Sequence, residues 1–252
     1  MAELQLRGLS LGAVDAVLFD KDGTLSISEP ELITLAAARV FLCLEQVEPA
    51  LRPPLRDLLE RAYGITAAGA AIHPAGITAV ATRDHNLVST ATALVQVGLG
   101  WPEALAMSES VFAEADRSEA RATSATSDGL LPWLEQLQAA GVQCAVISND
   151  DTAGIEQFLA NHRLEPFFSA LWSAEHRPRK PDPGAVRQLC TVLGVAVDRC
   201  ALIGDANSDL QMAVAAGIPH QRALGYTAAW RLPPPLQEPH PLVHHWSELS
   251  LA

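Results

Sequence analysis

A short apolar run that ends in paired carboxylates constrains the fold of this chain more than any other stretch. Residues 14–19 are long enough for a buried strand and too short for a helix. Asp20 and Asp22 follow directly, and Gly23 lets the backbone turn after them. Taken alone, this segment is also typical of a polar turn that merely closes a strand. In a parallel α/β sheet, however, carboxylates at the C-terminal end of a strand lie in the usual ligand crevice.

Two carboxylates this close together favour one of two arrangements. Either they bind a divalent cation, or one is ionised while the other holds a proton. The composition bears on this choice, since 17 basic and 29 acidic residues give a net charge of −12. Such a chain is not expected to attract nucleic acid or an anionic membrane. An anionic substrate would need positive charge supplied by the site itself, as a metal ion or a few placed cations.

The sequence predicts a cytoplasmic protein. Residues 1–11 contain Glu3 and Arg7 and lack the sustained apolar segment of a secretory signal, and no run approaches membrane-spanning length. The cysteines lack the paired spacing of a zinc or redox site. They are Cys43, Cys144, Cys190 and Cys200. Both a monomer and a homodimer agree with these features.

Residues 26–125 are predicted to form an all-helical insert. Apolar residues recur at helical spacing after a capping-box pattern at residues 28–31, and again in three later segments. The later segments are residues 54–63, 84–97 and 102–121. Residues 65–83 are rich in Ala and Gly and give no clear pattern, and small residues at 123–127 indicate a linker.

The rest of the chain alternates strands with helices, which predicts a parallel sheet with right-handed crossovers. Strands are expected at residues 142–147, 167–172, 200–203, 221–225 and 242–245, and helices at 129–140, 152–162, 183–193 and 208–216. We therefore predict an α/β core domain made of residues 1–25 and 126–252, with residues 26–125 as a second domain. The length of 252 residues suits such a core with a smaller domain attached.

Polar residues follow three of the predicted strands, and another polar residue lies in a loop. Ser148 and Asn149 end the strand at 142–147, and Asp205 and Asp209 follow the strand at 200–203. The C-terminal ends of parallel strands face the same crevice, so these side chains should meet Asp20 and Asp22 there. Lys180 lies in the loop before a helix. Each of these residues also has an ordinary structural explanation when taken alone. Asp205 and Asp209, for example, could be carboxylates favoured by the dipole at the N-terminus of a helix.

Taken together, these segments resemble the four ordered motifs of the haloacid dehalogenase superfamily. They are residues 20–24, 148–149, 180–183 and 204–209. The helical insert resembles the cap of the phosphoglycolate-phosphatase-like branch. The resemblance implies an α/β fold with a Rossmann-like parallel sheet core and an all-helical cap domain inserted after the first strand.

The resemblance also implies catalytic roles. Asp20 would be the nucleophile that forms an aspartyl-phosphate, and Asp22 would protonate the leaving oxygen and then activate water. Ser148 and the backbone N–H of Asn149 would bind the phosphoryl oxygens. Lys180 would supply positive charge beside the nucleophile and the phosphate.

A metal site follows from the same resemblance. Asp20, the backbone carbonyl of Asp22 and Asp205 would bind Mg²⁺, with Asp209 helping directly or through water. A set of oxygen ligands with few carboxylates suits magnesium.

The implied function is that of a Mg²⁺-dependent phosphatase acting on a small phosphorylated metabolite, with phosphoglycolate suggested by the family. Asp22 favours phosphate esters, because dehalogenases of this type lack an aspartate at that position. A phosphomutase of the β-phosphoglucomutase type remains an alternative with the same core and a similar cap. A non-catalytic binding protein is a third, although a retired site has no physical reason to keep several buried charges together.

Overall fold

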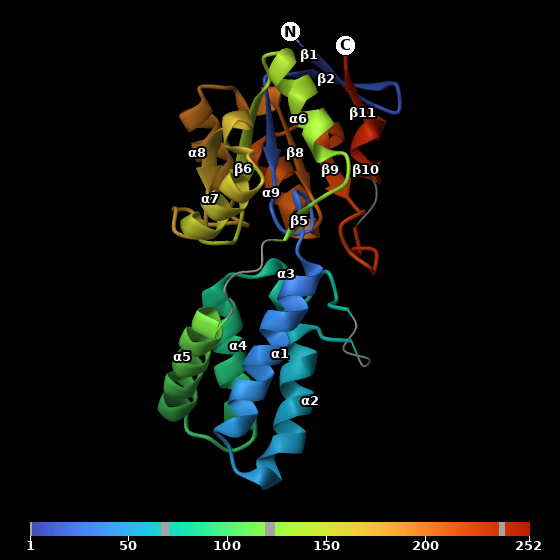
Figure 1. Ribbon diagram of the computed structural model, residues 1–252. Helices are drawn as coiled ribbons and strands as arrows, with labels where there is room; N and C mark the ends of the chain where they lie inside the picture. Colours follow the sequence, from blue (N-terminus) through green and yellow to red (C-terminus); the bar gives the residue numbers. More distant parts are fainter. Residues whose placement is uncertain (1, 67–70, 119–123, 237–239) are drawn as a thin grey trace. The chain divides into compact units, whose positions relative to one another are not determined.

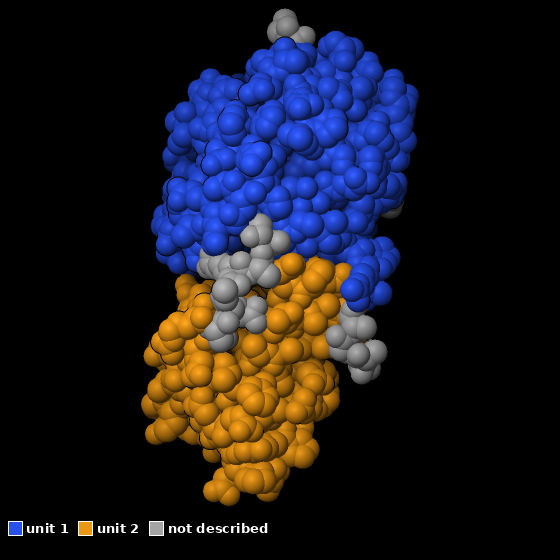
Figure 2. All heavy atoms as spheres, viewed as in Figure 1, with its two compact units in different colours: residues 1–28, 124–252 blue, residues 29–123 orange. Residues whose placement is uncertain are grey.

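The computed structural model describes residues 2–66, 71–118, 124–236 and 240–252. The chain divides into two compact units, one comprising Met1–Ser28 with Ser124–Ala252 and the other comprising Glu29–Thr123. Figure 2 colours the first unit blue and the second orange. No helix among the described residues is long and apolar enough to cross a membrane.

A six-stranded sheet forms the centre of the first unit, with the strand order β10-β9-β8-β3-β6-β7 (Figure 1). Every pairing within it is parallel. The strands are β3 (Ala16–Phe19), β6 (Gln143–Ile147), β7 (Phe168–Trp172), β8 (Cys200–Gly204), β9 (Ala223–Tyr226) and β10 (Leu242–Val243). All four residues of β3 are buried. The α/β class and the parallel sheet predicted from the alternating pattern are confirmed.

Helices cover both faces of this sheet. They are α6 (Leu130–Ala139), α7 (Thr152–Asn161), α8 (Pro183–Leu193) and α9 (Asn207–Ala216). Successive side chains of a strand point to opposite faces. Val17 and Phe19 accordingly join an apolar core with α6 and α7, while Ala16 and Leu18 join a second core with α8 and α9. Strand β3 is therefore held from both sides, which fixes the position of the residue that follows it.

A second, antiparallel sheet in the same unit was not predicted. It has the order β11-β1-β2, formed by β1 (Ala2–Leu6), β2 (Leu9–Val14) and β11 (Leu249–Leu251). The single strand expected over residues 14–19 is wrong at its start, because β2 ends at Val14 and Asp15 separates it from β3. The helical insert consequently follows the first strand of the parallel sheet, not the first strand of the chain.

The described residues of the second unit form five α-helices. They are α1 (Glu29–Glu45), α2 (Arg52–Tyr63), α3 (Ile77–Val80), α4 (Arg83–Gln96) and α5 (Trp101–Ser118). Helix α2 ends at Gly64 in a left-handed conformation, and the Thr82 side chain caps α4 by accepting a bond from the backbone N–H of His85. The short helix α3 lies in the stretch that gave no clear pattern. The end predicted for the last helix, near residue 121, lies outside the described residues.

Short elements complete the fold. Strands β4 (Ser26–Ile27) and β5 (Ala125–Thr126) pair antiparallel, although no strand was predicted within residues 26–125. Their two-residue length leaves no periodic pattern to detect. The 3₁₀ turns are η1 (Pro49–Leu51), η2 (Glu165–Phe167), η3 (Val197–Arg199), η4 (His220–Arg222) and η5 (Trp246–Glu248).

Candidate active site

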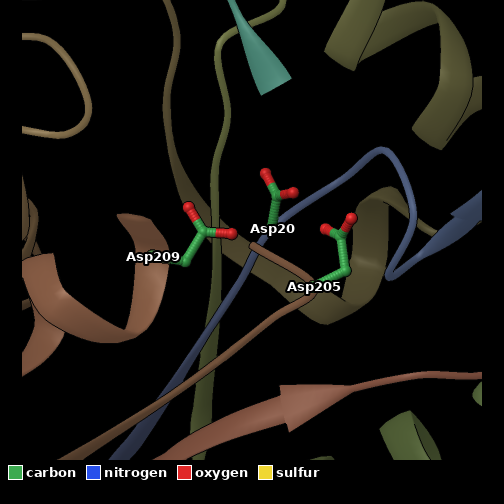
Figure 3. Close-up of side chains that lie close together, drawn as sticks. All are labelled: Asp20, Asp205 and Asp209. Atoms are coloured by element: carbon green, nitrogen blue, oxygen red, sulfur yellow. The ribbon is translucent and has the colours of Figure 1, made fainter. Parts of the chain in front are cut away.

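Three buried carboxylates meet at the C-terminal edge of the parallel sheet. Strand β3 lies between β6 and β8, so Asp20 at its end lies beside the loop that carries Asp205. Asp209 reaches the same place from the first turn of α9. Figure 3 shows the three side chains gathered around one point, and each contributes an oxygen within 4.8 Å of the others.

Because the three carboxylates of this cluster are buried, ionising all of them is unfavourable unless a cation is present. Asp20, Asp205 and Asp209 are 8 %, 2 % and 1 % exposed. Burial raises the pKa of Asp20 to about 6, with Lys180 opposing the shift and the charges of Asp209 and Asp22 adding to it. Burial, aided by the charges of Asp20 and Asp209, also raises the pKa of Asp205 well above its ordinary value. An all-oxygen set of this kind fits Mg²⁺, whose charge would keep the carboxylates ionised.

Lys180 connects two members of the cluster. Its ammonium group Nζ lies 2.7 Å from Asp20 Oδ1 and 2.8 Å from Asp209 Oδ1, and it also donates to the backbone carbonyl of Ile147 at 3.3 Å. Burial would lower its pKa, but the two carboxylates raise that pKa above the ordinary value. Lys180 is therefore a fixed cation that holds one oxygen of Asp20.

A second buried lysine performs a similar task that the sequence analysis did not foresee. The Lys21 ammonium lies 2.7 Å from Asp22 Oδ1 and 3.1 Å from Asp150 Oδ2. Lys21 and Lys180 are the only two lysines in the chain, and both are 7 % exposed. A compact ammonium with three donors suits a position between two carboxylates. Every lysine in this protein thus bridges a pair of aspartates at this edge of the sheet.

Asp22 is held apart from the acidic cluster. Its Oδ1 accepts bonds from Lys21 and from the hydroxyl of Ser26 at 3.2 Å. Burial raises the pKa of Asp22, but the charge of Lys21 and the hydrogen bonds from Lys21, Ser28 and Ser26 together lower it below its ordinary value. Asp20 and Asp22, two residues apart, therefore have pKa values shifted in opposite directions.

Ser148 and Asn149 follow β6 beside this cluster. The backbone N–H of Ser148 donates to the carbonyl of Trp172 at 2.9 Å, and its hydroxyl oxygen accepts from the backbone N–H of Asp150 at 3.1 Å. Since the hydroxyl acts as an acceptor there, its own proton can be directed to another acceptor. Ser148 is buried and Asn149 is partly exposed.

Trp230, in the loop after β9, also reaches the site. Its indole N–H donates to Asp205 Oδ2 at 2.7 Å, and the Thr24 hydroxyl donates to Asp205 Oδ1 at 3.4 Å. Lys21 and Asp150 could have been suspected from their places beside predicted site residues. Trp230 gave no signal, because it lies far along the chain from every motif.

Gly23 leaves room for this contact. Its φ of +78° lies in the left-handed region, and a Cβ there would clash with both Trp230 Nε1 and Asp205 Oδ2. We expect Gly23→Ala to destabilise the fold by about 1–2 kcal/mol for the backbone and by about 1–3 kcal/mol more for the clash. Urea unfolding measures the loss.

Gly8→Ala is the matched control for this substitution. Gly8 has a φ of +77° and open space around its Cβ position, so its replacement costs only the backbone part. Equal losses of unfolding free energy in the two variants would contradict the steric role of Gly23.

Known proteins with similar sequences agree with the site described above. Residues 14–217 match the family model of haloacid dehalogenase-like hydrolases. A phosphoglycolate phosphatase of Pseudomonas putida is 29 % identical over 203 residues, which cover 80 % of this chain and 66 % of the relative. A phosphoglycolate phosphatase of Thiobacillus denitrificans is 37 % identical over 93 residues, covering 36 % of this chain and only 41 % of that relative. The alignments thus span less than two thirds of these relatives.

Solved structures share the fold at low identity. A crystal structure described as a predicted phosphoglycolate phosphatase, from Haemophilus somnus, aligns with a TM-score of 0.68 at 19 % identity, covering 94 % of this chain and 97 % of that one. A candidate β-phosphoglucomutase from Thermotoga maritima aligns with a TM-score of 0.55 at 17 % identity, covering 85 % and 86 %. At these identities the likeness is one of fold.

Proposed function

The chain belongs to the haloacid dehalogenase-like hydrolases, and on this premise we propose that it is a Mg²⁺-dependent phosphatase that forms an aspartyl-phosphate on Asp20. The observation that carries the proposal is the contact between Lys180 and Asp20 inside the acidic cluster. A carboxylate held by a buried cation is oriented for attack. It also lies where the negative charge of a phosphoryl group can be neutralised.

The first chemical step forms the bond between Asp20 and phosphorus. The carboxylate oxygen attacks in line, the bond from phosphorus to the ester oxygen breaks, and the leaving oxygen takes a proton from Asp22. Lys180 stays charged through this step. The hydroxyl of Ser148 and the backbone N–H of Asn149 would donate to the phosphoryl oxygens.

The second step returns Asp20. Asp22, now ionised, accepts a proton from a water molecule, and the oxygen of that water attacks the phosphorus. The bond between phosphorus and the Asp20 oxygen breaks, which releases inorganic phosphate and the free carboxylate. Lys21 favours this step because it lowers the pKa of Asp22 and so stabilises the ionised base. Mg²⁺, held by Asp20, Asp205, Asp209 and the carbonyl of Asp22, would supply further positive charge to the phosphoryl oxygens.

A small phosphorylated metabolite is the proposed substrate, and phosphoglycolate is our first choice. The relatives named as phosphoglycolate phosphatases support this choice. Within the proposal, residues 1–25 and 126–252 form the catalytic domain, and residues 26–125 form a cap that selects the substrate. We place the enzyme in the cytoplasm, as a monomer or a homodimer.

Phosphate release from a panel of small esters tests the proposal. With Mg²⁺ we expect release from phosphoglycolate to exceed release from hexose phosphates, and EDTA should reduce it to the background rate until Mg²⁺ is restored. Release that is indifferent to EDTA would refute the metal requirement. Isomerisation of a sugar phosphate faster than phosphate release would indicate a phosphomutase, and neither reaction with Mg²⁺ bound would indicate a binding protein.

A further inference from the structure

We propose that Trp230 is a positioning residue for Asp205, holding one oxygen of this carboxylate so that the other faces the cation. The inference rests on the proposed function, because it takes the cluster of Asp20, Asp205 and Asp209 to be a Mg²⁺ site. It adds a residue that lies outside the four motifs.

The hydrogen bond itself is short and shielded from water. The indole Nε1 of Trp230 lies 2.7 Å from Asp205 Oδ2, and the two residues are 7 % and 2 % exposed. An indole nitrogen is a donor only, so its partner must be an acceptor, and the ionised carboxylate is the stronger one. The bond thus favours the form of Asp205 that binds a metal.

The hydrogen bond from Trp230 gives the two carboxylate oxygens of Asp205 different surroundings. Oδ2 faces the rigid indole, whereas Oδ1 faces the hydroxyl of Thr24 at a longer distance of 3.4 Å. Mg²⁺ prefers octahedral coordination with waters and one or two carboxylates. A carboxylate that offers a single well-oriented oxygen suits this requirement, and donors behind metal ligands commonly set such orientations.

Gly23 supplies a second, independent observation. A Cβ at this position would meet both atoms of the bond, Trp230 Nε1 and Asp205 Oδ2. The turn that carries Asp20 and Asp22 therefore closes directly over the pair. The turn, the loop after β8 and the loop after β9 therefore converge on one hydrogen bond.

Trp230→Phe removes the indole N–H and keeps an aromatic ring. Trp246→Phe is the matched control, because Trp246 is 1 % exposed and its indole donates to the Ser127 hydroxyl at 2.8 Å in the same unit. Both variants lose one buried indole hydrogen bond of similar length. Only the first loses a bond to a proposed metal ligand.

Calorimetric titration of the full chain with Mg²⁺ is the main test. We expect the dissociation constant to rise by about 10–100-fold in Trp230→Phe and to stay within about twofold of the native value in Trp246→Phe. An unchanged constant in Trp230→Phe would overturn the inference while leaving the proposed phosphatase intact. Failure of the native chain to bind Mg²⁺ would overturn both.

A measurement on the native chain covers the case in which Trp230→Phe does not fold. The five tryptophans give five indole N–H resonances; the other four Trp→Phe variants assign their own signals, and the remaining one belongs to Trp230. Mg²⁺ should shift the Trp230 resonance and leave that of Trp246 in place. Equal responses of the two resonances would contradict the positioning role.

Discussion

Asp20→Asn should lower phosphate release from the best ester by at least about 10³-fold, since loss of the proposed nucleophile would remove the proposed covalent route. The amide has nearly the shape of the carboxylate, but it does not attack phosphorus. It still offers an acceptor oxygen to Lys180, whose Nζ lies 2.7 Å from Asp20 Oδ1. Initial rates at saturating Mg²⁺ measure the effect, and circular dichroism checks the fold.

Asp15→Asn is the matched control at the opposite end of the same strand. Asp15 precedes β3 and forms an ion pair with Arg199, with an Nη2–Oδ1 distance of 2.7 Å. Its replacement should leave the rate within about twofold and reduce the unfolding free energy by at most about 1 kcal/mol, as for other solvent-accessible pairs. Comparable loss of activity in the two variants would refute the special role of Asp20.

Lys180→Met should impair both activity and stability. Removing a fixed charge beside the proposed position of the phosphoryl group is expected to lower kcat by about 10²–10³-fold. Breaking a buried pair leaves Asp20 and Asp209 without their cation, which should reduce the unfolding free energy by about 3–5 kcal/mol without Mg²⁺. Because the proposed Mg²⁺ would bind the folded site only, its addition should recover part of this loss. Steady-state kinetics and urea unfolding with and without Mg²⁺ measure the two effects.

Lys21→Met is the control for this second prediction. Lys21 is equally buried but bridges Asp22 and Asp150, so it is not in ion-pair contact with the proposed nucleophile. Because Lys21 lowers the pKa of Asp22, its removal should move the acidic limb of the pH–rate profile to higher pH. Lys180→Met should instead lower the rate across the whole profile. Identical profiles for the two variants would show that the lysines act only by general charge balance.

The sequence predicted the parts of the site that depend on topology. Once strands and helices alternate, the ends of β3, β6 and β8 must share an edge, and this brings Asp20, Ser148 and Asp205 to one place. The strand at β6 was recognisable because an apolar run ends abruptly in polar residues. Roles in the reaction came from the family resemblance and await the experiments described above.

Other features depend on contacts that no local pattern encodes. The antiparallel sheet pairs Leu4 with Leu251, residues at the two ends of the chain, and β11 has only three residues. The contact of Trp230 with Asp205 arises where a loop meets a turn. In each case the partner is chosen by tertiary packing, and tertiary packing is not visible in residue spacing.

The burial of both lysines affects how the protein reacts with amine-directed reagents. Amine-directed reagents modify lysine side chains and the N-terminal amine, but both lysines here are 7 % exposed and paired with carboxylates. Acylation of Lys21 or Lys180 in the folded chain should therefore wait for the sheet edge to open. The rate of lysine acylation, followed by peptide mass spectrometry, would then serve as a clock for opening of the site, and bound Mg²⁺ should slow it.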